Sequence, residues 1–591
     1  MNPSRLRKFA LLYPVLLILC GIGYAKYDSY RIDGDAVAFM DIADALRAHD
    51  FALVINGYWN PMYAGTLAIG QSIAHPSRVN ELQIFYWMNF WIFVACIFAC
   101  IYFVRSLVLL RERYGANTTT PPVLSPPALT LLALALLFFG FQRELSLGAV
   151  RADALLLFFI FLAASFLLRL QATQRFLFYP LLGIALGLAY LTKSFAFLPS
   201  AFLLTTIFVF GLTRKSTQRT RILSGAILAG ILFATIAGPY ILAISKQRGR
   251  FTTGESARLN YSFFIDNTGR WHEWHSGDLG HATATFKHHE QLIVDTPPVY
   301  SYARHPIGTY PLWFDPSYWT DTLQPHFWLK GHILRFLRNI VVFIRFLVGH
   351  LEALVVLAVL LLTGCFFPRQ RRDWLPFLPV ALLGLLMIAI YFPIDLQDRY
   401  LTGAFLLFLL PLFAMLRSSS ATKTSTQPST QTPTQPFTQT TAIASALTLL
   451  LAGLAVADAA ADLGFRRRTL STTGYPRGAY SKEIYPAAQG LNDLGIGYGQ
   501  TVACFGDAAC YTDHYWARIA DTPIRAEIEV PDGGDPNAFW QANAAHHDEI
   551  IAALRARNIT AIVGYFEPSG NIPAGWHQLG TSDVYAYPLN Q

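Results

Sequence analysis

The sequence is short of charge, and this shortage limits what the protein can be. Only 14% of its 591 residues are charged, whereas 53% are hydrophobic. An average soluble domain carries about 25% charged residues. Together with a mean hydropathy of +0.36, this composition predicts a polytopic membrane protein.

Three further features are missing. No basic and aromatic surface occurs outside short loops, so the net charge of +8 does not indicate a nucleic-acid partner. No Gly-rich phosphate loop follows the first strand predicted in the C-terminal part, so no nucleotide site is assigned. No small-x-small cleavage site separates the run Phe9–Ala25 from a soluble domain. We therefore expect that run to remain as a transmembrane helix.

Long apolar runs recur along the chain and predict about eleven membrane spans, of which some are short and two could be re-entrant. Their approximate bounds are Phe9–Ala25, Ile84–Leu110, Ala128–Phe141, Ala152–Leu170, Phe178–Leu191, Phe195–Leu212, Ile222–Ile244, Val348–Phe367, Leu375–Phe392, Leu401–Leu416 and Ala442–Ala461.

The basic residues predict the orientation of these spans. With the N-terminus in the cytoplasm, every predicted inside loop is basic, as the positive-inside rule requires. These loops contain Arg105, Arg111, Arg113, Arg169, Arg175, Arg214, Lys215, Arg219, Arg221, Arg369, Arg371, Arg372, Arg417 and Lys423. The long segments 26–83, 245–347 and 462–591 then all lie outside.

The C-terminal third divides into three parts. Residues 417–441 are rich in Ser, Thr, Gln and Pro and predict a disordered cytoplasmic linker. Residues 442–461 form the last predicted span. Residues 462–591 alternate helical stretches (Ser481–Leu494 and Pro536–Arg557) with extended ones (Thr501–Phe505, Thr560–Tyr565 and Val584–Pro588), which predicts a small exterior α/β domain.

Cysteine is scarce, and four of the six residues, Cys20, Cys96, Cys100 and Cys365, lie in or beside apolar runs. There a thiol behaves as a small hydrophobic group. Cys504 and Cys510 lie in the predicted exterior domain, where a disulfide and two free thiols are both open.

The first exterior segment contains several carboxylates beside the membrane. A charge there is energetically unfavourable unless it has a function or is paired with an opposite charge. Apolar spacing predicts a short helix over Ala36–Ala48, and a second helix is expected over Tyr63–Ile73, after the Asn60-Pro61 break. Asp41, Asp44 and Asp50 are interpreted as a solvated helix face. Asp33 and Asp35, between the first span and the helix, are the candidate functional pair.

Four motifs occur in one order on the predicted exterior side: Asp35-x-x-x-Phe39-x-x-x-Ala43, Arg151-Ala152-Asp153, the segment from Gly187 to Lys193, and Asp398-Arg399-Tyr400-Leu401. Over residues 1–416 this set resembles the GT-C glycosyltransferase superfamily, which includes protein O-mannosyltransferases and the lipid A aminoarabinose transferase. Ala36 and Phe39 depart from the acidic residue and the tyrosine usual there.

The resemblance implies transfer of a sugar from a polyprenyl-phosphate donor. Asp35 would then be the general base, with Asp33 as the alternative. Lys193, Arg399 and Arg151 would bind the donor phosphate, and Asp153 would position an acceptor or orient Arg151. Two simpler readings stay open: the basic residues could be interfacial anchors, and Asp153 a helix N-terminal carboxylate.

The segment 245–347 is rich in aromatic residues and histidine. A substrate lid is expected there, because aromatic rings stack on sugars. Its members are Trp271, His272, Trp274, His275, Tyr310 and Trp319. The spacing of His272, Glu273, His275, Asp278 and His281 is irregular for a metal site, so no metal ligand is assigned. The resemblance leaves a divalent cation open, because some relatives use one.

The expected function is therefore transfer of a lipid-linked sugar to an envelope acceptor (lipid, glycan or protein), at the exterior face of a bacterial inner membrane. Two alternatives from other classes remain. One is a membrane solute transporter, although the acidic residues lie at span ends and no inverted repeat is found. The other is a non-catalytic protein of envelope glycan assembly, which the missing acidic residue at Ala36 keeps open.

Overall fold

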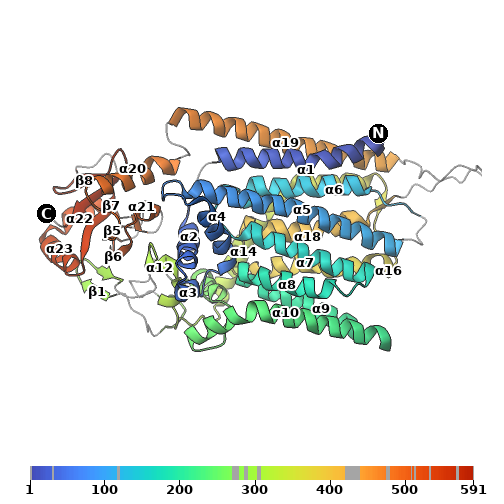
Figure 1. The fold of residues 1–591 in the computed structure, drawn as a ribbon, viewed down its shortest axis with the longest axis horizontal. Coiled ribbons are helices and arrows are strands. Elements are labelled where there is room, and N and C mark those ends of the chain that lie inside the picture. Colours follow the sequence, from blue (N-terminus) through green and yellow to red (C-terminus); the bar gives the residue numbers. More distant parts are fainter. Residues whose placement is uncertain are drawn as a thin grey trace, which may run out of the picture.

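The computed structural model describes residues 3–28, 32–115, 120–213, 215–268, 279–284, 291–302, 308–418, 439–473, 479–506, 509–510, 514–531, 534–566 and 572–589. Most of the predicted linker, residues 419–438, lies outside these ranges. The described chain forms a bundle of long helices with a smaller mixed domain at one end (Figure 1).

Nine helices in the described ranges are long and apolar enough to cross a membrane, and one bent pair would make ten. The spans are built from α1 (Pro3–Tyr27), α5 (Glu81–Gly115), α6 (Pro126–Gly140), α7 (Asp153–Thr173), α9 (Phe197–Leu212), α10 (Ser216–Arg248), α17 (Leu378–Tyr391), α18 (Asp398–Met415) and α19 (Gln439–Thr473). The apolar helix α8 (Phe178–Thr192) is shorter. Each predicted apolar run overlaps at least one helix, although Val348–Phe367 also contains a helix break and the short strand Cys365–Phe366. The polytopic helical fold is confirmed, with nine or ten spans in the described ranges instead of about eleven.

Helices are the expected solution here, because a backbone in hydrocarbon must satisfy its own hydrogen bonds. Small residues let the helices approach closely. At Gly183 of α8, for example, a Cβ atom would lie 2.3 Å from the carbonyl oxygen of Ala229 in α10. Helix α6 begins with a common N-cap arrangement. The Ser125 side chain accepts a hydrogen bond from the Ala128 amide, and Pro126 is the first residue of the helix.

The bent pair comprises α14 (Leu329–Gly349) and α15 (Leu351–Leu362), which meet at 68°. Helix α14 exposes apolar side chains such as Leu337 and Val341 but buries Arg335 and Asn339. Arg335 pairs with Asp395, and the Asn339 side chain donates to the Phe392 carbonyl at 2.8 Å. The segment predicted as wholly exterior therefore ends in a helix whose outer face suits lipid.

Three short helices lie against one end of the bundle, beside the C-terminal domain: α2 (Gly34–Arg47), α3 (Phe51–Val54) and α4 (Pro61–Ala74). We call this the site end. The N-terminus lies at the opposite end, called the far end (Figure 1). Helices α2 and α4 correspond to the two helices predicted after the first span.

The C-terminal domain holds α20 (Ala479–Asp493), α21 (Tyr515–Ile519), α22 (Pro536–Ala542) and α23 (His547–Arg555), and the strands β5 (Thr501–Phe505), β6 (Ile524–Ile528), β7 (Ile559–Tyr565), β8 (His577–Gln578) and β9 (Val584–Pro588). Strand β5 pairs in parallel with β6 and β7, and β9 is antiparallel to β7. The small α/β domain is confirmed, with three of its strands where they were predicted.

Two strands of this sheet come from the segment between α10 and α14. Strands β1 (Gln291–Val294) and β2 (Val299–Ser301) extend the sheet in the order β1-β2-β6-β5-β7-β9-β8. Strand β2 pairs antiparallel with β6, with Tyr300 opposite Glu527. The domain is therefore completed by chain that precedes it by about two hundred residues.

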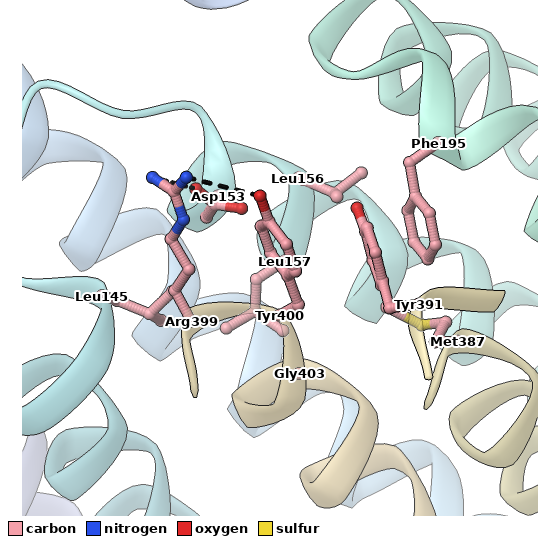
Figure 2. A pocket seen from close by; sticks show the side chains of 10 residues that line it. All are labelled: Leu145, Asp153, Leu156, Leu157, Phe195, Met387, Tyr391, Arg399, Tyr400 and Gly403. Carbon is pink, nitrogen blue, oxygen red and sulfur yellow. Dashed lines mark hydrogen bonds and ion pairs between the residues drawn. The ribbon is translucent and has the colours of Figure 1, made fainter. Parts of the chain in front are cut away.

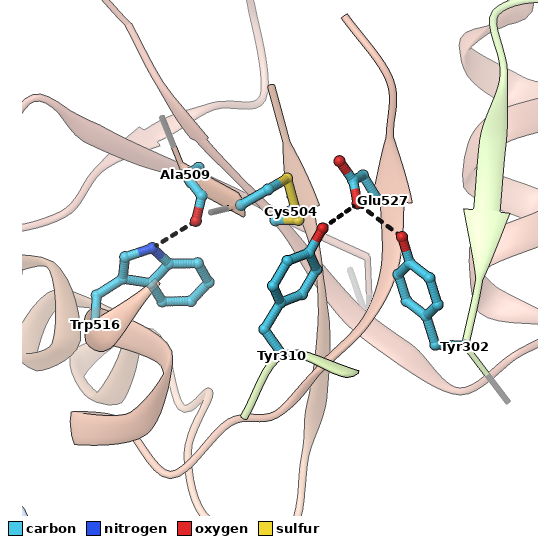
Figure 3. Close-up of a disulfide and its surroundings, with 7 residues drawn as sticks. Tyr302, Tyr310, Cys504, Ala509, Trp516 and Glu527 are labelled. Atoms are coloured by element: carbon cyan, nitrogen blue, oxygen red, sulfur yellow. Dashed lines mark hydrogen bonds between the residues drawn. A yellow bond between two sulfur atoms is a disulfide. The ribbon is translucent and has the colours of Figure 1, made fainter. Parts of the chain in front are cut away.

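A disulfide joins Cys504 and Cys510, which decides between the two alternatives left open by the sequence. Figure 3 shows it beside Glu527, whose Oε2 accepts hydrogen bonds from the hydroxyl groups of Tyr302 (2.8 Å) and Tyr310 (2.7 Å). These two hydrogen bonds therefore connect the segment around β2 to the C-terminal domain, in addition to the pairing of β2 with β6.

Candidate functional site

Three carboxylates and three cations from distant parts of the chain meet at the site end. Arg151 donates to Asp33 at 2.5 Å, and Lys193 donates to Asp153 at 2.7 Å. Arg399 connects the cluster, because its guanidinium lies 3.6 Å from Asp35 and 3.9 Å from Asp153. The structure thus brings together all six residues predicted as the base and phosphate-binding groups.

Asp33 and Asp35 differ in their surroundings. Asp33 is the N-cap of α2. Its Oδ1 atom accepts a hydrogen bond from the Ala36 amide at 3.1 Å, and its Oδ2 atom accepts one from Arg151. Among the described residues, the only salt-bridge partner of Asp35 is Arg399. Burial, together with the nearby Asp33 charge, raises the pKa of Asp35 to about 6, although Arg399, Arg151 and Lys193 oppose this rise.

The backbone around Lys193 is positioned by Asn60. Lys193 follows the last turn of α8 in an extended conformation, before the short helix Ser194–Ala196. The Asn60 side chain donates to the Tyr190 carbonyl at 2.8 Å and accepts from the Ser194 amide at 3.1 Å. The polar residue before Pro61 therefore fixes the turn that directs Lys193 toward Asp153.

Asp395 and Asp398 lie close to Arg399 in the sequence, but their salt-bridge partners among the described residues are other arginines. In the structure Asp395 pairs with Arg335, and Asp398 pairs with Arg345 at 3.1 Å. Side chains of α14 neutralise both carboxylates. Arg399 lies near Asp35 and Asp153, and its Nε atom donates a hydrogen bond to Gln397 at 2.9 Å.

A small apolar pocket, with a cavity volume of about 20 Å³, opens beside Arg399 and Asp153. Figure 2 shows Phe195, Tyr391 and Tyr400 as a row of rings in it, with centroids 4.3 Å and 4.2 Å apart along the row. The Lys193 ammonium lies 4.3 Å from the Tyr400 ring centroid. The remaining walls are Leu145, Leu156, Leu157, Met387 and Gly403. Cations therefore border an apolar, aromatic space.

The predicted lid is only partly within the described residues. Trp271, His272, Trp274 and His275 lie outside them, as do Glu273 and Asp278. Tyr310 and Trp319 are buried: Tyr310 binds Glu527, and the Trp319 indole donates to the Pro311 carbonyl at 3.0 Å. These two side chains pack at the junction with the C-terminal domain and present no open ring face to a sugar.

No metal centre is found among the residues that the structure describes. His281, one of the weighed ligands, stacks on Trp328 with centroids 4.0 Å apart. The one described group with suitable spacing is Cys504, Cys510 and Glu527. Its two sulfur atoms form the disulfide, so they do not offer thiolate ligands.

The carboxylates farther along α2 were interpreted as a solvated face, and for Asp41 and Asp44 this was wrong. Arg518 of α21 donates to Asp41 at 2.7 Å and to Glu81 at 2.7 Å, and lies 3.0 Å from Asp44. Its side chain is only 2% exposed. Burial raises the pKa of Asp41, although Arg518 and Thr309 oppose the rise. The helix that carries Asp35 is therefore tied to the C-terminal domain.

The other end of α2 is held by aromatic packing. Gly34 lies against the Trp313 indole, and a Cβ atom at Gly34 would be 2.1 Å from that ring. Phe39 packs between Trp59 and Tyr63, with ring centroids 5.3 Å and 5.1 Å away. The phenylalanine that replaces the usual tyrosine thus has a packing role.

Sequence reasoning missed Asn60, Tyr58, Tyr391 and Arg518. Tyr58 donates to Asn260 at 2.9 Å, and burial with the nearby Asp35 raises its pKa. Tyr391 had a signal, since an aromatic residue at the end of an apolar run is typical of a membrane interface. Arg518 had none, because its partners lie more than 430 positions away.

The long spans, the short helices at the site end and the terminal sheet domain define a polytopic helical membrane protein with a small mixed domain at one end. The structure is similar over its whole length to ArnT from Cupriavidus metallidurans. The apo crystal structure of ArnT has 10% identity and a TM-score of 0.50, covering 99% of this chain and 98% of that one. The structure bound to undecaprenyl phosphate has 11% identity and a TM-score of 0.51, covering 98% of both.

These matches confirm the GT-C resemblance at the level of the fold. No protein-family model matches the chain, and no curated protein matches its sequence. The fold is therefore shown by structure, and the chemistry has to be argued from the site itself.

Proposed function

We propose that the protein is an integral-membrane glycosyltransferase that moves a sugar from a polyprenyl-phosphate donor to a hydroxyl group of an envelope acceptor. One observation carries the proposal: Asp35 lies beside Arg399, and Arg399 borders an apolar pocket at the site end of a GT-C fold. A candidate base, a group of cations and an apolar, aromatic lining then lie together.

The pocket suits the donor's chemistry. Leu156, Leu157 and Met387 give it apolar walls that would have to move apart to admit the first isoprene units, because its volume is about 20 Å³. The ring row ends beside Lys193 and Arg399. A phosphate at this rim would meet Arg399 and Lys193 where they now contact Asp153. Undecaprenyl phosphate is bound by the similar ArnT of the crystal structure, which supports a donor of this kind.

In the proposed reaction Asp35 accepts the proton of the acceptor hydroxyl. The freed oxygen bonds to the anomeric carbon, and the bond from that carbon to the donor phosphate breaks. The phosphate leaves with the electron pair, and Lys193, Arg399 and Arg151 stabilise its added charge. A single displacement of this kind inverts the anomeric configuration. Asp35, with its pKa raised to about 6, is mostly ionised at pH 7 and can act as the base.

We place the site end at the exterior face of a bacterial inner membrane and the N-terminus in the cytoplasm. The support is the charge pattern, because the short basic loops of the sequence lie toward the far end. An exterior site fits the disulfide of the C-terminal domain, since such bonds persist in oxidising compartments.

The test is transfer of sugar from a radiolabelled polyprenyl-phosphate donor in membranes containing Asp35→Asn. Activity should fall by about 10²- to 10⁴-fold, the usual contribution of a general base. Asp50→Asn is the matched control, because this exposed carboxylate belongs to the same segment but caps α3. Full activity in Asp35→Asn would remove Asp35 from the role of base. A wild-type protein that transfers from no lipid-linked sugar would contradict the function itself.

A further inference from the structure

A second, larger groove lies at the far end of the bundle. It has a volume of about 890 Å³ and is bordered by α7, α8, α9, α10 and the segment that begins α17. On α7 it reaches Gln171, eighteen positions after Asp153, which places it about 27 Å along the helix from the candidate site. We call it the far-end groove. The proposed transfer reaction gives it no role.

The inner walls of the far-end groove are apolar. They are formed by Leu167, Leu170, Phe202, Ile207, Leu378 and Leu382. Apolar cavities of this kind are poor places for water, because ordered water needs polar partners. Since the groove lies between membrane-spanning helices, lipid chains are the available apolar filling.

The mouth of the groove carries positive charge. Arg221, near the start of α10, is exposed and forms no salt bridge with any residue that the structure describes. Arg372 is 55% exposed, and its Nε atom lies 3.7 Å from Asp373. Gln171, Gln174 and Gln218 add hydrogen-bonding groups at the same level. Basic pockets between transmembrane helices favour anionic head groups over zwitterionic ones.

We propose that the far-end groove is a binding site for an anionic glycerophospholipid, with its head group at Arg221 and Arg372 and an acyl chain between α7, α9 and α17. The three helices carry Asp153, the residues just after Lys193, and Tyr391 at their other ends. A lipid between them therefore braces the helices that hold the candidate site. The proposal stands independently of the transfer reaction.

The experiment is native mass spectrometry of delipidated full-length protein, titrated with phosphatidylglycerol or with phosphatidylethanolamine of identical acyl chains. The wild type should bind phosphatidylglycerol more tightly. At about fivefold for each arginine near a head group, Arg221→Ala with Arg372→Ala should weaken that binding about 25-fold and leave phosphatidylethanolamine nearly unchanged.

Two further variants make the test specific. Arg219→Ala with Arg369→Ala removes the same charge from exposed positions outside the described lining, and should bind like the wild type. Thr206→Trp fills the groove and should weaken both phospholipids. Equal affinity of the wild type for the two lipids, or an equal loss in the control pair, would overturn the proposal. Displacement of phosphatidylglycerol by undecaprenyl phosphate would instead assign the groove to a polyprenyl chain.

Discussion

Replacing Arg518 by methionine tests how firmly the C-terminal domain holds α2. The wild-type guanidinium binds Asp41 at 2.7 Å and Glu81 through two nitrogens at 2.7 Å and 2.9 Å. Methionine keeps similar bulk but leaves the buried Asp41 without its cation and Glu81 with only the longer contact to Arg78, at 3.4 Å. Removing one partner of a buried ion pair costs about 3–5 kcal/mol. Native stability is typically about 5–15 kcal/mol, so the variant should fold while the contact opens more often.

The assay is hydrogen exchange of full-length protein in nanodiscs, read on peptides from α2 and α21. A loss of 3–5 kcal/mol corresponds to about a hundred- to several-thousand-fold lower protection, limited by global unfolding. Arg518→Lys should lose less, because one ammonium can satisfy part of the cluster. The double variant Arg518→Met with Glu81→Gln should recover part of the loss. Unchanged protection of α2 in Arg518→Met would refute the idea that this contact holds the helix.

Two further predictions concern the candidate site. The pH profile of kcat/KM for sugar transfer should fall on the acid side near pH 6, because Asp35 loses its base form as the pH drops through its raised pKa. Asp33→Asn removes a negative neighbour that raises this pKa, so the acid limb should move to lower pH; a limb that stays fixed would exclude this coupling. Lys193→Ala should weaken donor binding about tenfold or more, measured as KM for the lipid-linked sugar, while Lys246→Ala, an exposed lysine in the last turn of α10, should not. Equal effects of the two lysine variants would count against a phosphate role for Lys193.

The sequence predicted the parts of the fold that depend on local pattern. Apolar runs located the spans, and strands such as Thr501–Phe505 and Val584–Pro588 were found at their observed bounds. The cluster of Asp35, Asp153 and Arg399 was also foreseeable, because the charge of the short loops assigns these helix ends to one side of the membrane. Packing of the helices into one bundle then brings these three side chains close together.

The remainder depends on contacts between remote segments. Asp41 looked solvated because its helix shows a polar face, and nothing nearby reveals that Arg518 will cover it. Strand β2 lies in a segment of mixed composition, and its pairing with β6 is visible only in three dimensions. The different partners of Asp395 and Asp398 arise likewise from α14, which the predicted topology had left outside the membrane region.

The shared sheet and the Arg518 contact also determine when the site can be completed during synthesis. Helix α2 is among the first segments to leave the ribosome, whereas Arg518 follows 477 positions after Asp41. Strands β1 and β2 must likewise wait for β6 to be translated. A chain that stops before the last domain could insert every described span and still leave Asp41 of α2 without Arg518. Anchoring of α2 is therefore a late step, because Asp41 has its salt-bridge partner among the described residues only once Arg518 is translated, whereas Asp33, Asp35 and Asp44 find cations earlier in the chain.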